Sequence, residues 1–595
     1  MSWIGAGQLA VLTILLLAIT RPLGSYMASV FEGRTTFLSW PLRRLELLLY
    51  RLGGVDPTAE QSWSAYAGAC LAFGLVNFLF FYALLRLQGL LPFNPNRFGT
   101  GMAPTGAVPM TPDLAFNTAV SFMTNTSWQS YPGETTVSYF VQMLGVAVQS
   151  FTSAAAGMAV AVAVIRGFTR REARGIGNFW VDLTRSTLYV LLPLAFLGAL
   201  FLGSQGVVQN FHDYSRITTI EGAKQIIPLG PVASQEPIKL LSSDGGGFFN
   251  ASSAHPFENP TPLTNLVEIL LMLAIPAGLT YTFGRMVKDQ RQGGVLFVAM
   301  LLLFVCGGWI AEWTEQRGTP GLRAAGIDES AATDPGGNME GKELRFGVAG
   351  AVLFSVASTA SADGAMNSVH DSYTPVAGLV QMLNLKTGEV IFGGVGSGLV
   401  SMLLMVLVTV FIAGLMVGRT PEYLGKKIES KEMKMVMLSL VAGAAAILLF
   451  SGATLLIHFR ASGYWNPPGN SLANLANTGP HGLSEILYAN ASTVATNGSA
   501  FAGLNANTPW FNLTLALEML IGRFLVILPA LAIAGNLARK KRLVATSGTL
   551  PTRGPLFVML LLGSILLITA LTFFPALSLG PIAEHYLMSS GVLYR

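Results

Sequence analysis

The chain has 595 residues, of which 52% are hydrophobic and 11% charged, and its formal net charge is +5. Soluble globular proteins carry about 25% charged residues. This composition therefore excludes a soluble protein and indicates one that is embedded in a lipid bilayer.

Ten apolar stretches follow one another along the chain, and each is long enough to cross a bilayer as a helix of roughly 20 residues. They cover residues 4–20, 66–88, 135–165, 183–204, 262–284, 295–313, 375–418, 436–459, 509–538 and 555–577. The first has no basic residue before it and no clear cleavage site, so we interpret it as a span and not as a signal peptide. The sequence predicts an all-α membrane protein with ten transmembrane helices.

Most of the 36 Lys and Arg residues lie in five loops, each of which follows an odd-numbered span. These loops carry Arg21, Arg34, Arg43, Arg44 and Arg51; Arg166, Arg170, Arg171 and Arg174; Arg285, Lys288 and Arg291; Arg419, Lys426, Lys427, Lys431 and Lys434; and Arg539, Lys540, Lys541, Arg542 and Arg553. Cytoplasmic loops carry the Lys/Arg excess, so both termini are expected on the outer side. The loops serve either as solvated anchors or as a docking surface for a cytoplasmic partner.

Four short polar segments, centred on Ser127, Gly246, Gly364 and Gly498, recur at nearly regular intervals. They are residues 124–129, 243–248, 361–367 and 496–501. Polar backbone at membrane depth is tolerated only where protein or water covers it. Ordinary polar turns are the alternative, but four such segments around one axis would form an ion filter lined with carbonyl oxygens.

A short apolar stretch precedes each polar segment, at residues 112–123, 235–241, 346–358 and 482–494. At about 1.5 Å per residue these half-helices are too short to cross the membrane. Their C-termini carry partial negative charge, so four of them meeting at mid-depth would favour a cation there.

The repeating order is a span, an outward loop, a half-helix, a polar segment and a second span. It divides the chain into a first helix with its cytoplasmic loop, four repeats with fourfold pseudo-symmetry, and a last helix with an outward tail. The expected boundaries are 1–65, 66–174, 175–293, 294–434, 435–545 and 546–595.

Glycine reaches the unusual dihedrals of a filter without a Cβ clash. Gly245, Gly246, Gly364 and Gly498 fit this requirement. The first segment has no glycine, so we expect Thr126 and Ser127 to adopt the filter conformation there.

The seventh apolar stretch is too long for one span, since 44 residues of helix would reach about 66 Å across a core of about 30 Å. Gly388, Gly393, Gly394, Gly396 and Gly398 interrupt it. We expect residues 384–398 to form a gating loop beneath the filter that blocks free conduction. A helix end followed by a surface turn is the alternative.

Two arginines are candidates for coupling. Arg523 lies inside the ninth span, where a charge is costly and usually faces protein or water. It either repels cations, pairs with Glu518 or a partner protein, or snorkels to the inner surface. Arg419 ends a span and is either a second functional charge or an interfacial anchor.

No nucleotide-binding motif of the form Gly-x-x-x-x-Gly-Lys-Ser/Thr is present. Leu385-Lys386-Thr387-Gly388 is similar to a phosphorylation motif, but leucine replaces the aspartate that a phosphoryl acceptor needs. The chain is expected to have no catalytic site and to bind neither nucleotide nor nucleic acid.

The filter motifs resemble those of the KdpA family, the potassium-binding subunits of the bacterial Kdp potassium-transporting ATPase. The resemblance covers nearly the whole chain, and its most specific motifs are Gly245-Gly246-Gly247-Phe248-Phe249-Asn250-Ala251 and Asn497-Gly498-Ser499-Ala500-Phe501-Ala502-Gly503-Leu504. It implies that K⁺ is bound by filter backbone carbonyls of Thr126 and Ser127, Gly245 and Gly246, Asp363 and Gly364, and Asn497 and Gly498. Ser127, Asp244 and Asp363 depart from the residues expected at their positions.

The resemblance further implies high-affinity, ATP-driven K⁺ uptake across a bacterial or archaeal inner membrane. Two small membrane subunits, together with a separate P-type ATPase subunit, would complete the complex. The competing interpretation is a self-sufficient K⁺ channel or ion-coupled symporter of the same superfamily.

Overall fold

The computed structural model describes residues 2–100, 109–324, 326–327, 329, 336–460, 474–544 and 548–591. Residues 1 and 592–595, at the ends of the predicted terminal segments, lie outside the described residues, as do residues 545–547, where the last two predicted segments join.

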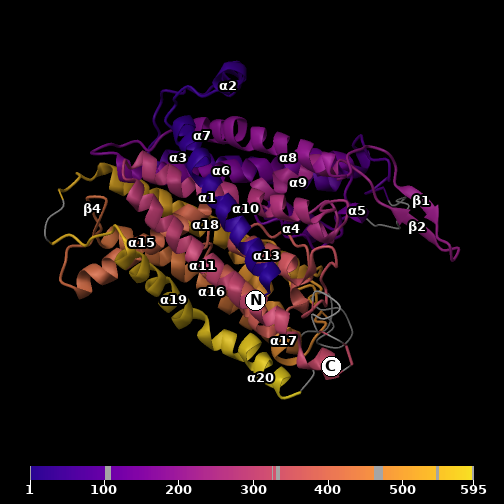
Figure 1. Ribbon diagram of the computed structural model, residues 1–595. Coiled ribbons are helices and arrows are strands. Elements are labelled where there is room, and N and C mark those ends of the chain that lie inside the picture. The colour runs from indigo at the N-terminus through magenta and orange to yellow at the C-terminus, as the bar shows by residue number, and fades with distance from the viewer. Residues whose placement is uncertain are drawn as a thin grey trace.

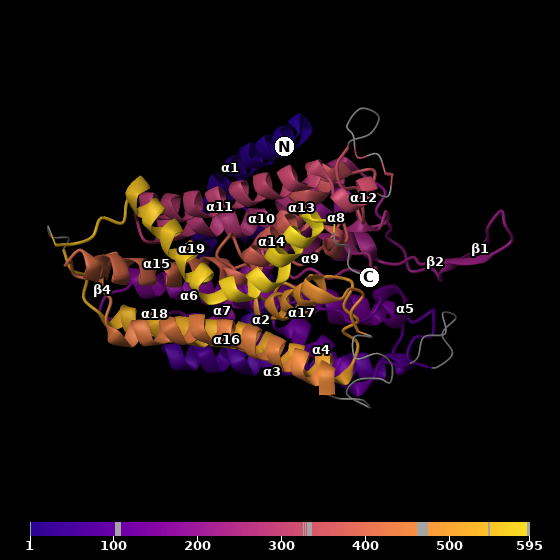
Figure 2. The same ribbon diagram turned by 90° about the horizontal axis from the view of Figure 1, so that it is seen from below.

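The described residues form ten helices that are long and apolar enough to cross a membrane, which confirms the predicted number. They are α1 (Trp3–Phe31), α3 (Trp63–Leu87), η2 with α6 (Val141–Ala147, Val148–Thr169), α7 with η3 and α8 (Phe179–Arg185, Ser186–Leu191, Leu192–Ser204), α10 (Pro262–Met286), α11 (Gln290–Arg317), α15 (Ser397–Met416), α16 (Ser430–Arg460), α18 (Pro509–Arg539), and α19 with η6 and α20 (Pro555–Leu577, Ser578–Ile582, Ala583–Ser589). Figures 1 and 2 show them side by side along one direction.

Four short helices match the predicted half-helices. They are α4 (Pro112–Met123), α9 (Val232–Leu241), α13 (Gly347–Ala360) and α17 (Gly479–Val494). In both views they lie well away from β4, at one end of the bundle (Figures 1 and 2).

The remaining elements are short. They are α2 (Ser39–Leu52), η1 (Gln88–Leu90), α5 (Gly133–Thr136), η4 (Ser252–Ala254), α12 (Pro320–Ala324), η5 (His370–Ser372), α14 (Pro375–Lys386), and the antiparallel hairpins β1–β2 (Ser215–Thr218, Lys224–Ile227) and β3–β4 (Glu422–Tyr423, Lys426–Lys427). The two hairpins are additions to the predicted all-α fold. The β1–β2 hairpin projects from the body of the molecule (Figure 1).

Burial separates an inner from an outer set of long helices, with α8 and α11 between the two sets at 44% each. The most apolar window is 83% buried in α6 with η2, 72% in α10, 67% in α15 and 56% in α18. The corresponding share is 28% in α1, 17% in α3, 22% in α16 and 33% in α19. The inner set is the set of predicted second spans, so each second span lies toward the centre of the molecule.

Threonine and proline mark the starts of the inner helices. Thr261 caps α10 through the backbone N–H of Thr264, and Thr508 caps α18 through that of Phe511. Proline follows each cap, where its missing N–H costs no hydrogen bond. These local signals set where two of the inner helices begin.

The first helix departs from the expected boundary, because α1 continues to Phe31 and Arg21 lies inside it instead of in the following loop. Packing against α10 explains the extension. A Cβ built on Gly24 would lie 2.5 Å from the carbonyl oxygen of Gly278, and the Thr282 hydroxyl donates to the Gly24 carbonyl at 3.0 Å. This close contact holds the last turns of α1 helical despite Pro22.

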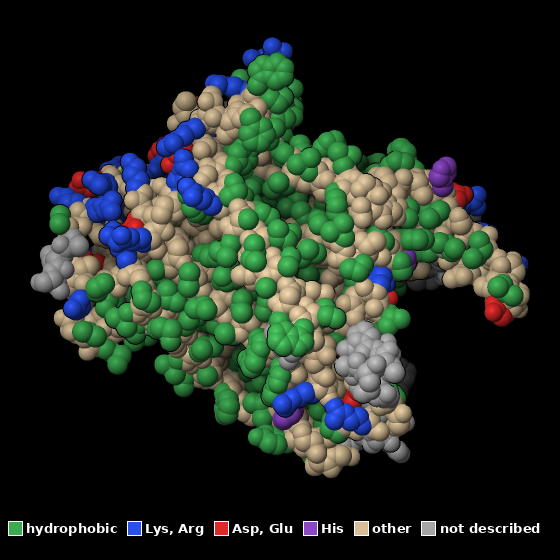
Figure 3. All heavy atoms as spheres, viewed as in Figure 1, with side chains coloured by type: hydrophobic (Ala, Val, Ile, Leu, Met, Phe, Trp, Pro, Cys, Tyr) green, Lys and Arg blue, Asp and Glu red, His purple; other side chains and the backbone are tan. Residues whose placement is uncertain are grey.

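Lys and Arg side chains gather at one end of the molecule, around β4 and the nearby helix ends (Figure 3). The two termini lie away from that end (Figure 1). The long helices therefore connect a basic end to an end that carries the half-helices.

Candidate functional site

The four half-helices end in segments that share one backbone pattern. Each segment has positive φ at two residues separated by one position, namely Asn125 and Ser127, Ser243 and Gly245, Ala362 and Gly364, and Thr496 and Gly498; in the second segment Gly246 also has positive φ. Positive φ is uncommon for residues other than glycine. Its recurrence at two equivalent positions of all four segments is therefore a distinctive shared conformation. The pattern aligns Gly245 with Ser127 and places Asp244 level with Thr126, Asp363 and Asn497.

The four segments approach one another closely enough to form a closed ring. A Cβ built on Gly245 would lie 1.9 Å from the carbonyl oxygen of Asp363, one on Gly364 would lie 1.9 Å from that of Asn497, and one on Gly498 would lie 2.0 Å from that of Thr126. On the remaining side, a Cβ on Gly246 would lie 3.2 Å from the Ser127 Cβ. Three of these four junctions therefore have no room for any side chain on the glycine.

Hydrogen bonds between neighbouring segments hold the ring together. The Asn125 amide donates to the Ser243 carbonyl at 2.6 Å, and the Gly247 N–H donates to Gln129 Oε1 at 3.1 Å. The Asn497 amide donates to the Ser358 carbonyl at 2.9 Å. Sequence reasoning missed Asn125 and Gln129 as ring residues, although both lie inside the first polar segment.

The second segment rests on a buried charge network. Lys239 lies 2.9 Å from a Glu236 oxygen and 2.7 Å from Glu258 Oε2, while the other Glu258 oxygen accepts the Phe249 N–H at 2.9 Å. Ser252, which Lys239 also contacts, donates to the Gly246 carbonyl at 2.8 Å. Because removing one partner of a buried ion pair is strongly destabilising, this network fixes the backbone around Gly246.

The predicted side chains at the ring are almost fully buried. Thr126, Asp244, Asp363 and Asn497 are each 0% exposed. Asp363 Oδ1 accepts the Ala365 N–H at 3.1 Å. Neither oxygen of Asp244 has a hydrogen-bond partner within the described part of the chain.

A cavity of about 330 Å³ opens on one side of the ring. All four segments line it, through Ser127, Gly246, Gly364 and Gly498 among others. The wall of the cavity also includes the aromatic side chain of Trp128 and the amide side chains of Gln129, Asn250 and Asn505. The four segments thus share one mouth on this side of the ring.

The predicted gating loop lies between α14 and α15, where the seventh apolar stretch is broken as expected. The Gly393 N–H donates to the carbonyl of Ala360, the last residue of α13, at 2.9 Å. Glu389 accepts from the Thr496 hydroxyl at 2.9 Å and from the Gly394 N–H at 3.2 Å. The loop therefore contacts the ends of two half-helices, which fits the expected place and not a surface turn.

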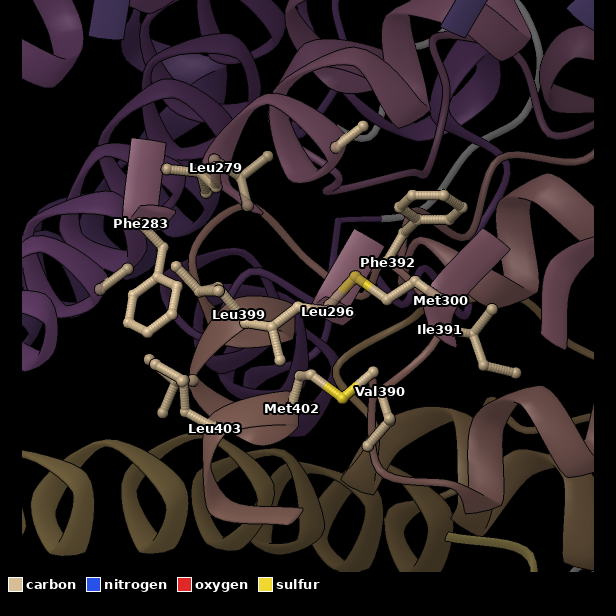
Figure 4. Close-up of a cluster of buried hydrophobic side chains, with 14 of the residues drawn as sticks. Leu279, Phe283, Leu296, Met300, Val390, Ile391, Phe392, Leu399, Met402 and Leu403 are labelled. Carbon is tan, nitrogen blue, oxygen red and sulfur yellow. The ribbon is translucent and has the colours of Figure 1, made fainter. Parts of the chain in front are cut away.

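Three apolar side chains anchor this loop in the core. Figure 4 shows Val390, Ile391 and Phe392 beside Leu296 and Met300 of α11 and Leu399, Met402 and Leu403 of α15. The Phe392 ring lies 6.1 Å from that of Phe297 and 5.9 Å from that of Phe304. These contacts pack the loop into the same apolar core as α11 and α15.

The predicted glycines of the loop have different surroundings. Gly393 and Gly396 adopt positive φ, and a Cβ on Gly396 would lie 2.2 Å from the Gly157 carbonyl oxygen of α6. A Cβ on Gly394 would lie 2.6 Å from the Ser397 hydroxyl. Gly388 has positive φ but open space around it, and it lines a second, mostly apolar cavity of about 500 Å³.

Arg523 lies beneath the first segment. It is 5% exposed, and its Nη2 donates to the Ser153 carbonyl at 2.8 Å, while the Ser153 hydroxyl donates to Asn125 Oδ1 at 2.9 Å. Glu518 instead accepts from the Thr493 hydroxyl at 2.6 Å. Glu389, which sequence reasoning did not single out, lies close enough to Arg523 for an electrostatic interaction.

Arg419 lies apart from the ring. It follows α15 at the basic end, and its Nη1 donates to the Thr549 carbonyl at 3.0 Å. The structure therefore does not bring Arg419 and Arg523 together.

The sequence pattern of one protein family, described as the potassium-transporting ATPase A subunit (KdpA), matches residues 10–586. The chain is 54% identical to the potassium-transporting ATPase potassium-binding subunit of Solibacter usitatus (strain Ellin6076), over 99% of each chain. It is 55% identical to the protein of the same description in Rhodospirillum centenum (strain ATCC 51521 / SW), over 98% of this chain and 97% of the relative. Among solved structures, the potassium transporter TrkH from Vibrio parahaemolyticus is similar with a TM-score of 0.49 and 14% identity, over 87% of this chain and 97% of that one.

Proposed function

The chain belongs to the family of potassium-transporting ATPase A subunits, and from this membership we propose that it binds K⁺ in the ring of four polar segments. It delivers the ion for transport that a separate P-type ATPase subunit drives. The chain itself is the non-hydrolytic, potassium-binding member of that complex.

One observation carries the proposal, namely the closed ring of four segments that share an alternating left-handed backbone. Filters of this kind replace the hydration shell of K⁺ with backbone carbonyl oxygens. The carbonyls that would supply them are those of Thr126 and Ser127, Gly245 and Gly246, Asp363 and Gly364, and Asn497 and Gly498. The shared φ pattern adds the carbonyl of Asp244, which lies level with those of Thr126, Asp363 and Asn497. The four half-helix C-termini add partial negative charge at the same place.

The gating loop and Arg523 would control what happens below the ring. Residues 387–396 are the part of the predicted loop that lies between α14 and α15. They contact the end of α13 and Thr496, just beyond α17, and would obstruct passage toward the basic end. The positive charge of Arg523 would oppose a cation that takes a direct path along α6. In this proposal Gly388, Gly393, Gly394 and Gly396 allow the loop its shape, and Arg419 serves as an anchor at the basic end.

We further propose the surroundings of the chain. The complex lies in a bacterial or archaeal inner membrane with two small membrane subunits beside the ATPase subunit. The basic end faces the cytoplasm because Lys and Arg collect there, so the termini and the mouth of the ring face outward. The six segments bounded at 65, 174, 293, 434 and 545 would then be a first helix, four repeats and a last helix.

The test compares Gly498→Ala with Gly563→Ala in the purified complex. A Cβ at 498 would lie 2.0 Å from the Thr126 carbonyl oxygen, whereas a Cβ at 563 meets nothing within 4 Å. We expect Gly498→Ala to raise the K⁺ concentration that half-saturates ATPase activity by on the order of tenfold or more, which corresponds to about 1.4 kcal/mol, and Gly563→Ala to leave it unchanged. Equal K⁺ dependence in both variants would contradict the filter assignment.

A further inference from the structure

His481, near the start of α17, lies between two carboxylates from distant parts of the chain. Its Nε2 lies 3.0 Å from Asp371 Oδ1, in η5, and its Nδ1 lies 2.7 Å from Glu584 Oε1, in α20. Glu485 lies about one turn further along α17, and ligand atoms of Asp371, His481 and Glu485 are all within 4.8 Å of one another. We name Asp371, His481, Glu485 and Glu584 the outer cluster.

Among the described residues, acidic groups outnumber basic groups in the outer cluster. Three carboxyl groups and one imidazole make up the cluster, so its acidic groups outnumber its basic group by two. Within the described part of the chain, no Lys or Arg forms an ion pair with Asp371, Glu485 or Glu584. Carboxylates that share a site repel one another, so a dication is the natural counter-charge.

Glu485 has an oxygen available for a ligand. The side chain is 0% exposed; Oε1 accepts from the Asn477 amide at 3.0 Å, but Oε2 has no hydrogen-bond partner in the described structure. A buried polar oxygen without a partner costs free energy. A Cβ built on Gly503 would lie 2.4 Å from Glu485 Oε1 and 2.8 Å from Asp371 Oδ2. The two carboxyl groups therefore both pack against this glycine, where a side chain would not fit.

We propose that the outer cluster binds a transition-metal dication, for which Zn²⁺ is the best fit, through Asp371, His481 Nε2 and Glu485. Zn²⁺ takes imidazole nitrogen and carboxylate oxygen at about 2.0–2.2 Å, commonly with three protein ligands and a water. The metal replaces the proton that Nε2 shares with Asp371, and that proton leaves to solvent. The side chains of Asp371 and His481 are 13% and 12% exposed, so water can reach the fourth position.

Glu584 would orient the histidine without touching the metal. Metal-bound histidines commonly hold their second ring nitrogen on a carboxylate, which fixes the tautomer and the ring orientation. Glu584 occupies this place on Nδ1. Because it belongs to α20, the metal would also fasten the C-terminal helix to α17, and Figure 1 shows these two helices at the same end of the molecule.

The experiment uses the purified complex that contains the full chain. The complex is stripped with EDTA, incubated with ZnCl₂, desalted and analysed for zinc by mass spectrometry. We expect stoichiometric Zn²⁺ in the wild type, at least a tenfold weaker affinity in His481→Gln and Glu485→Gln, and a 10–100-fold weaker affinity in Glu584→Gln. His585→Gln, which changes the residue beside Glu584, is the matched control and should keep the metal.

Cobalt substitution reports on the ligands directly and needs no variant. Co²⁺ in a site with one imidazole and two carboxylates should give visible absorption bands that added Zn²⁺ removes. If the wild-type complex retains no Zn²⁺ and shows no cobalt bands, the proposal is overturned. The outer cluster would then be a network of ion pairs that links η5, α17 and α20. Equal zinc binding by the wild type, His481→Gln and Glu485→Gln would overturn it as well.

Discussion

At the scale of single residues, the ring contains carboxylates where an amide would satisfy the same local geometry. Asp363 Oδ1 accepts the Ala365 N–H at 3.1 Å, and Asn497 Oδ1 accepts the Ser499 N–H at 3.1 Å. The two side chains therefore accept the same backbone hydrogen bond in their turns, and Asp363 differs by being an ionisable group. Neither oxygen of the Asp244 carboxyl group has a hydrogen-bond partner in the described structure, a costly arrangement that a nearby cation would relieve.

Asp244→Asn should therefore separate stability from ion binding. Replacing a buried carboxyl group whose oxygens have no hydrogen-bond partner should raise the free energy of unfolding by about 1 kcal/mol or more, measured by thermal unfolding in the absence of K⁺. The same change should raise the half-saturating K⁺ concentration for ATPase activity, because the attraction for the cation is lost. Asp363→Asn should change stability less, since one Asp363 oxygen already has a partner. Lower stability of Asp244→Asn, or unaltered K⁺ dependence, would contradict this role.

At the scale of elements, the second spans support the half-helices through close backbone contact. A Cβ built on Gly522 of α18 would lie 2.0 Å from the carbonyl oxygen of Val494, the last residue of α17. Small residues of this kind let helices approach closely within a membrane. Position 522 thereby fixes the depth at which the fourth half-helix ends.

Gly522→Ala should displace α17 and weaken the protein. Overpacking of this kind costs about 1–3 kcal/mol, so we expect a lower melting temperature and a higher half-saturating K⁺ concentration. Gly294→Ala in α11 is the matched control, because a Cβ there meets nothing within 4 Å. If Gly522→Ala and the control melt at the same temperature, the contact between position 522 and the Val494 carbonyl does not fix the position of α17.

The gating loop is the second element with a clear experimental consequence. Gly396→Ala would place a Cβ 2.2 Å from the Gly157 carbonyl oxygen, whereas Gly388→Ala also changes a glycine of positive φ but meets open space. We expect Gly396→Ala to move the loop away from α6 and raise passive K⁺ flux into proteoliposomes without ATP. Gly388→Ala should not raise it. Passive flux at the wild-type level in Gly396→Ala would reject a blocking role for the loop.

Local chemistry explains which elements could be predicted from the sequence. Residues 112–123 follow a threonine–proline start and end at a polar segment, and α4 has these bounds. The glycines near position 390 likewise predicted the break between α14 and α15. The β1–β2 strands could not be predicted, because β1 is exposed at every position and therefore has no alternation of apolar and polar residues.

The closure of the ring depends on contacts that sequence spacing does not encode. Gln129 accepts from Gly247, and Glu389 accepts from Thr496, across separations of 118 and 107 residues. Composition predicts that such positions are polar but does not identify their partners. The polar segments were therefore predictable one by one, whereas the order in which they meet required the structure.

At the scale of the whole molecule, the inner and outer helices explain why one chain can form a fourfold ring. Each inner helix follows a polar segment and is buried by its neighbours, while the outer helices α1, α3, α16 and α19 present apolar side chains such as Val76, Leu449 and Leu571. In lipid these exposed side chains cost nothing, because the bilayer core is as apolar as they are. The outer set thus forms an apolar wall around the ring, while the Lys and Arg residues at the basic end set its orientation in the membrane.

That orientation gives the last prediction. Lys427 lies in β4 at the basic end, and Ser590 follows α20 near the C-terminus; both are exposed. In a background in which Cys306→Ser removes the exposed native thiol, leaving the buried Cys70, we expect Ser590→Cys to react with a membrane-impermeant maleimide in intact cells. Lys427→Cys should react only after the membrane is permeabilised, since loops rich in Lys and Arg remain in the cytoplasm. Labelling of Lys427→Cys in intact cells would reverse the assignment and would place the mouth of the ring on the cytoplasmic side.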